Sequence, residues 1–138
     1  NLVRARELFE EHLETTSGLR EELGTPASQR DMSVSLEKLG DIEVAEENLV
    51  RARELFEETL EIARGLRDEL GTPESLRDVV ASYSKLSTAL DGKAKLEAAE
   101  KGLLVAQELA RDFPDYPHQV LEEMEQHCAK LKQEISGE

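Results

Sequence analysis

The chain has 138 residues and a formal net charge of −14, and charged residues make up 35% of it. Phosphate binding needs clustered Lys and Arg, so this balance argues against DNA, RNA or an anionic membrane as the main partner and favours a basic one. Aromatic residues make up only 4% and Trp is absent, so the core must consist mainly of aliphatic side chains.

The length corresponds to one ordinary domain, which we expect to extend over residues 1–138. Cys128 is the only cysteine, so no internal disulfide can form, and a reducing compartment is compatible with the sequence. No apolar run approaches the roughly 20 residues that span a bilayer, and no signal peptide opens the chain. We therefore predict a cytoplasmic protein without membrane association. Because the chain lacks an initiator Met and begins inside a repeat, we expect it to be part of a longer protein.

Residues 1–25 are predicted to be half of a repeat, a single helix that we call helix B. Its apolar side chains recur at three- and four-residue steps and therefore form one stripe on a helix. They are Leu2, Ala5, Leu8, Phe9 and Leu13.

The same segment returns 47 residues later, where Asn48 aligns with Asn1. More than half of the aligned residues are identical, which is typical of a structural module that is stacked to make a surface. Residues 26–72 form one complete repeat, with helix A from about Pro26 to Glu46 followed by a second helix B. Residues 73–114 form a more diverged repeat.

The joint between helix B and the next helix A has the sequence Leu-Gly-Thr-Pro in both copies. Gly24 and Gly71 are placed to end a helix in the left-handed conformation. Thr25 and Thr72 can then accept hydrogen bonds from free amides of the next helix, and Pro suits its first position. This pattern predicts a helix–turn–helix joint.

The joint between helix A and helix B differs between the copies. Asp91-Gly92 is a clear helix breaker in the later copy, whereas the earlier one has only Gly40 and Asn48 around a helix-compatible segment. We expect a hairpin because the copies should stack alike. The alternative is a helix A that continues into helix B.

Residues 115–138 are predicted to form a C-terminal capping helix, from about Pro117 to Ser136, after two prolines end the repeat pattern. One face of this helix is apolar and the other polar. The apolar face consists of Leu121, Met124, Cys128, Leu131 and Ile135.

The chain resembles the tetratricopeptide repeat (TPR) family at Leu39-Gly40, Ala52 and Phe56. Leu86, Ala99 and Leu103 repeat the pattern, with Ser87 in place of the glycine. The period exceeds the standard length of about 34 residues and is closer to the long repeats of kinesin light chain and of bacterial tandem TPR arrays. Glu47 departs from the turn glycine usual in the family.

The resemblance implies an all-α fold, a right-handed superhelical solenoid of antiparallel helix pairs with about six helices. It also implies a non-enzymatic scaffold that binds a protein or peptide on the concave face formed by the A helices. The alternative function is a structural module that self-assembles through repeat stacking.

By the same resemblance, the peptide-binding side chains belong to the two A helices. They are Val34, Glu37, Lys38, Asp41, Ala45, Ala81, Ser84, Lys85 and Thr88. Lys38 and Lys85 recur in register and could hold a carboxylate, the alternative being two ordinary solvated lysines. Asp41 and Thr88 stand where chaperone-tail-binding relatives have Asn, so we do not expect a dicarboxylate clamp.

No catalytic, cofactor or metal site is predicted. His12, His118 and His127 do not share a helix face, and His127 and Cys128 are adjacent and point in different directions on a helix. Cys128 fits an apolar filler better than a nucleophile.

Self-association is predicted through the first helix. The stripe Leu2, Ala5, Leu8, Phe9 and Leu13 has no preceding helix A to cover it, and exposed apolar side chains are adhesive. We expect a homodimer, formed face to face or by exchange of the first helices. The alternative is a monomer whose first helix folds back or frays.

Overall fold

The computed structural model describes residues 2–137, with the side chains of residues 15–23 excepted. The described chain forms six helices and is 87% helical, with no strand among these residues. This confirms the all-α prediction. The helices are α1 (Leu2–Leu23), α2 (Pro26–Ala45), α3 (Leu49–Leu70), α4 (Pro73–Thr88), α5 (Gly92–Asp112) and α6 (Gln119–Ser136).

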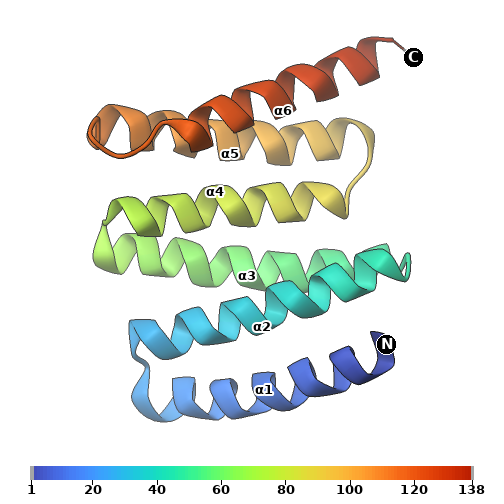
Figure 1. Ribbon diagram of the computed structural model, residues 1–138, viewed down its shortest axis with the longest axis vertical. Coiled ribbons are helices and arrows are strands. Elements are labelled where there is room, and N and C mark those ends of the chain that lie inside the picture. The colour runs from blue at the N-terminus through green and yellow to red at the C-terminus, as the bar shows by residue number, and fades with distance from the viewer. Residues whose placement is uncertain (1, 138) are drawn as a thin grey trace.

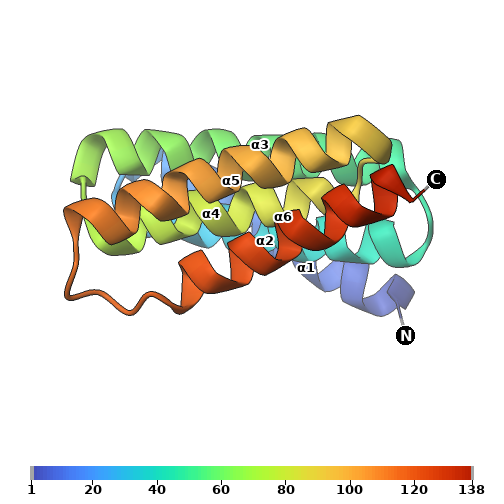
Figure 2. The same cartoon turned by 90° about the horizontal axis from the view of Figure 1, so that it is seen from above.

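Each helix packs against the next one along the chain, and successive helices run in opposite directions (Figure 1). The stack therefore proceeds in sequence order from α1 at one end to α6 at the other. In the perpendicular view, α3 and α5 lie toward one side of the stack, and α2, α4 and α6 toward the other (Figure 2). Residues 47 positions apart in α3 and α5, or in α2, α4 and α6, consequently lie toward the same side of the stack.

The two Gly-Thr-Pro joints have the predicted geometry. Gly24 and Gly71 are left-handed, with φ of 58° and 60°. In each joint the Thr hydroxyl oxygen accepts a 3.1 Å hydrogen bond from the backbone amide of the Ser three residues later, Ser28 or Ser75. That Ser hydroxyl donates to the Thr carbonyl in return, so each N-terminus is capped reciprocally.

The first A–B joint is a hairpin, because α2 ends at Ala45 and α3 begins at Leu49. Glu47 has φ of 63°, a left-handed conformation that favours glycine. The Asn48 amide donates to the Glu43 carbonyl at 2.8 Å and the Glu47 amide to Val44 at 3.0 Å, which is the pattern of a Schellman motif. The fused helix is therefore not observed, and Glu47 occupies the position of the usual turn glycine.

The tightest helix contact involves Gly40 of α2 and Phe56 of α3. Phe56 is fully buried, together with Ala52, and packs with residues of both α2 and α4. A Cβ atom on Gly40 would lie 2.4 Å from Phe56 Cε1, so only glycine allows this approach. In the diverged repeat, Ser87 replaces the glycine and the smaller Leu103 replaces the phenylalanine.

The C-terminal helix packs on α5 through its apolar stripe, as predicted. Met124, Cys128 and Leu131 are buried, and Leu121 and Ile135 are half-buried. Most of the other described side chains of α6 are exposed and polar. The helix thus closes the apolar core at this end of the stack and begins two residues after the predicted Pro117.

Candidate protein-binding surface

The side of the stack formed by α4 and α6 carries a groove of about 390 Å³, here called the α4–α6 groove. Its apolar lining comes from Val80, Ala81, Val120 and Met124. Its polar lining comes from Arg77, Ser84, Lys85, Thr88 and Glu123. Four of the nine residues predicted to bind a peptide therefore line one groove, namely Ala81, Ser84, Lys85 and Thr88.

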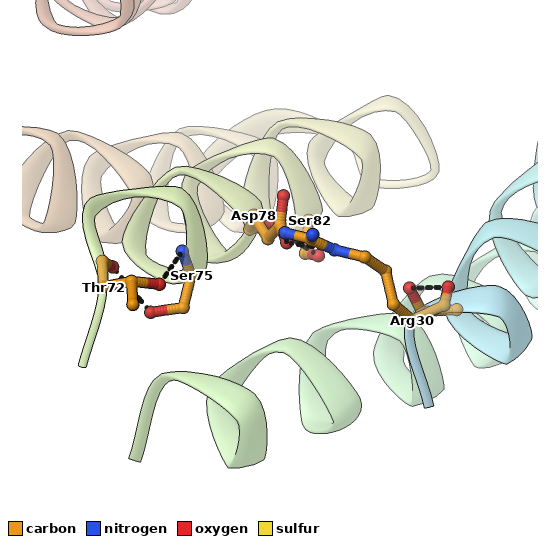
Figure 3. Close-up of polar contacts among 6 residues, drawn as sticks. Arg30, Thr72, Ser75, Asp78 and Ser82 are labelled. Carbon is orange, nitrogen blue, oxygen red and sulfur yellow. Dashed lines mark hydrogen bonds and ion pairs between the residues drawn. The ribbon is translucent and has the colours of Figure 1, made fainter. Parts of the chain in front are cut away.

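A smaller hollow of about 130 Å³ lies between α2 and α4 and is called the α2–α4 hollow. It contains the predicted residues Val34 and Glu37, and it shares Ala81 with the groove. An ion pair between Arg30 and Asp78, 2.5 Å apart, bridges α2 and α4 at this point (Figure 3). This pair ties the two A helices together, and its hydrogen bonds raise the pKa of Arg30.

Lys85 is engaged within the protein. Its Nζ lies 3.0 Å from Asp41 Oδ1 and 3.9 Å from Glu37 Oε1, so it links α4 to α2. Lys38 and Lys85 recur in register in the sequence, but their surroundings differ. Lys38 is exposed and has no ion pair with another described residue. The two lysines therefore have different neighbours, although they are equivalent in the repeat.

Ala45 and Lys38 lie outside both depressions. Ala45 is exposed at the end of α2, and neither residue lines the α4–α6 groove or the α2–α4 hollow. Asp41 also lines neither and instead receives the Lys85 ammonium. The predicted set is therefore divided between a groove, a hollow, an internal ion pair and two exposed positions.

Sequence reasoning missed five of the groove residues, which are Arg77, Val80, Val120, Glu123 and Met124. Val120 and Met124 belong to α6, which was interpreted only as a cap. The period indicates that α6 follows α5 as α4 follows α3, so it could have been recognised as a third A-type helix. Ser84 donates a hydrogen bond of 3.1 Å to Met124 Sδ, which joins the two walls of the groove.

The stripe on α1 is only partly exposed. Phe9 and Leu13 pack against a buried cluster formed by α2 and α3, and Ala5 is half-buried. Leu2 and Leu8 are exposed at 44% and 47%. The expected stripe without a preceding helix A is therefore not exposed along its whole length, because α2 and α3 cover Phe9 and Leu13. Val3, which was not predicted, is also exposed.

The surroundings of two histidines and of the cysteine are given by burial and by contacts within the protein. Burial lowers the pKa of His127 and raises the pKa of the Cys128 thiol. His12 Nδ1 lies 2.5 Å from the hydroxyl of Ser35, which is fully buried. Among the described residues, no group of three or more His, Cys, Asp or Glu side chains could hold a metal ion, and no helix could cross a membrane.

Comparison with protein-family models, with curated proteins and with solved structures finds no match. The functional argument therefore depends on the surfaces of this chain alone.

Proposed function

We propose that this chain is a non-enzymatic TPR-like solenoid that binds a peptide or domain of another protein in the α4–α6 groove. The observation that carries the proposal is the lining of that groove. Apolar side chains line part of it, and two hydroxyls and three charged groups line the rest. Protein-binding sites typically combine an apolar centre with polar groups that set orientation.

The repeat pattern supports the same function. Leu39-Gly40, Ala52 and Phe56 are the residues on which the TPR resemblance depends, and Gly40 and Phe56 form the close helix contact that such a repeat requires. Stacked repeats present one extended face that is built from equivalent helices, here α2, α4 and α6. The proposal includes a cytoplasmic location. It also includes a basic partner, which is inferred from the net charge.

The test is affinity capture with the partner identified, followed by calorimetric titration of that partner. Ala81→Arg places a long charged side chain at the exposed Ala81 in the groove, and we expect at least about tenfold weaker binding. Ala45→Arg is the matched control, because Ala45 is also exposed on an A helix but lies outside the groove. A partner that binds both variants as tightly as the wild type would exclude the groove.

A second candidate function is self-association, and the observation that favours it is the exposed apolar surface of Leu2, Val3 and Leu8 on α1. A second copy that covers this surface would remove it from water. Sedimentation equilibrium should then give a mass of twice 15.5 kDa, reduced to the monomer mass by Leu8→Glu. Leu104→Glu is the control, since Leu104 is 66% exposed on α5. A monomer at all concentrations would eliminate this candidate.

A further inference from the structure

The opposite side of the stack carries a pocket of about 260 Å³ between α3, the C-terminal part of α4 and α5. It is called the α3–α5 pocket, and α3 and α5 lie away from α2, α4 and α6 in Figure 2. Leu60, Leu86 and Leu90 supply apolar lining together with Tyr83. The Tyr83 hydroxyl forms no hydrogen bond with another described residue. The lining of the pocket is therefore mainly apolar and includes one tyrosine.

Cationic groups outnumber carboxylates around this pocket, although the whole chain has a net charge of −14. Arg53 pairs with Glu57 of its own helix at 2.6 Å. Arg64 and Lys101 are exposed and form no ion pair with any described residue. Arg64 and Lys101 therefore lie on the rim without an ion pair, and Glu97, which also lines the pocket, likewise has none with a described residue. The lining as a whole has three cationic groups and two carboxylates.

The first repeat can be compared with the second at the position of Arg53. Arg6 occupies the place of Arg53, and its guanidinium reaches across to α2 and the turn after it, 3.0 Å from Glu43 and 2.6 Å from Glu46. The hydrogen bond with Glu46 is the main cause of a raised pKa for Arg6. In this layer the arginine is therefore neutralised by carboxylates of the neighbouring helix and its turn.

In the second layer the groups that would close the contact are replaced. Leu90 stands at the position of Glu43, and Lys93 at that of Glu46. Lys101 likewise stands at the position of Glu54. Both layers have an opening at this place, and the one in the first layer is lined by Glu43, Glu47 and Glu54. The opening therefore recurs with the repeat, whereas its charge changes from mainly acidic in the first layer to a small excess of cations in the second.

We propose that the α3–α5 pocket binds an acidic peptide segment that inserts one apolar side chain. Sites for whole small molecules generally have about 300–1,000 Å³, so this volume suits a single side chain of a larger ligand. Arg64 and Lys101 would bind carboxylates on either side of the inserted residue, and an arginine can do so through two parallel hydrogen bonds. This site is separate from the α4–α6 groove.

The test uses a fluorescein-labelled peptide with a central Leu-Phe flanked by Asp and Glu, and fluorescence anisotropy as the readout. We expect saturable binding by the wild type. The variant Arg64→Glu/Lys101→Glu should weaken it at least about tenfold, because each change replaces attraction with repulsion. Lys38→Glu/Arg77→Glu is the matched control with the same change in net charge on the A-helix side, and it should change affinity by less than about twofold.

Two further measurements keep the proposal distinct from the groove. Leu90→Glu restores the acidic group found in the first layer and should prevent binding, with the helical circular dichroism signal unchanged. Ala81→Arg should leave it unaffected. Absence of saturable binding, equal binding of a peptide with Lys in place of Asp and Glu, or equal weakening by both charge-reversal variants would overturn the proposal. Failure of the groove experiment would leave these outcomes unchanged.

Discussion

Helices α1 and α3 begin with the same ten residues, Leu2–Glu11 and Leu49–Glu58, yet their apolar side chains have different environments. Leu55 of α3 is 2% exposed, whereas the equivalent Leu8 of α1 is 47% exposed. Phe56 is fully buried and Phe9 only half-buried. The difference arises because α3 packs between α2 and α4, while among the described residues α1 is covered on one side only, by α2 and part of α3.

This comparison shows that the burial of a side chain depends on the neighbouring helices and not on the sequence of its own helix alone. The stripe that is the centre of the core in α3 becomes a partly exposed surface in α1. Leu2 and Leu49, by contrast, are exposed in both copies, at 44% and 37%. The first turn of helix B thus projects beyond the neighbouring helices in either layer.

The largest expected effect comes from truncating the equivalent leucines. Leu55→Ala should reduce the free energy of unfolding by about 2–5 kcal/mol, because it leaves a cavity in a packed core. Leu8→Ala should reduce it by less than about 1 kcal/mol, since nearly half of that side chain already contacts water. Urea unfolding followed by circular dichroism measures both values. Equal losses would mean that α1 is covered in solution, and would contradict the exposed face.

A smaller effect is expected at the close contact that α1 lacks. Gly40→Ala forces a methyl group into the ring of the immobile Phe56, so the protein should lose about 1–3 kcal/mol of stability. Gly65→Ala in α3 is the control, because no atom would lie within 4 Å of its new Cβ. That control should stabilise the protein by about 0.5–1 kcal/mol through helix propensity. Thermal denaturation that ranks the two variants in the opposite order would disprove the contact.

The smallest effect concerns the turn that precedes α3. Glu47→Gly relieves a left-handed non-glycine residue and should stabilise the protein by about 1 kcal/mol. Glu47→Ala removes the same charge but retains the strain, so it should give no comparable gain. Both free energies come from urea unfolding. If the alanine variant were as stable as the glycine variant, repulsion among carboxylates and not the backbone would be responsible.

Local features of this chain could be predicted from the sequence because their causes lie within a few residues. The caps at Thr25 and Thr72 and the left-handed glycines before them depend on neighbouring amides and carbonyls alone. The stripe of α6 follows from helical periodicity. Gly40 and Phe56 could be singled out from the sequence only as residues of the TPR resemblance.

Only the tertiary structure decided which repeat-equivalent residues form the same contacts. Lys85 pairs with Asp41 across helices, while its repeat equivalent Lys38 remains exposed. Arg6 pairs with carboxylates of α2 and the turn after it, whereas its repeat equivalent Arg53 pairs with Glu57 of its own helix. Burial and ion pairing depend on the surface that a neighbouring helix presents, and this surface is set by packing between segments about 40 residues apart. Equivalent residues of the repeat therefore differ in burial and in ion pairing from one layer to the next.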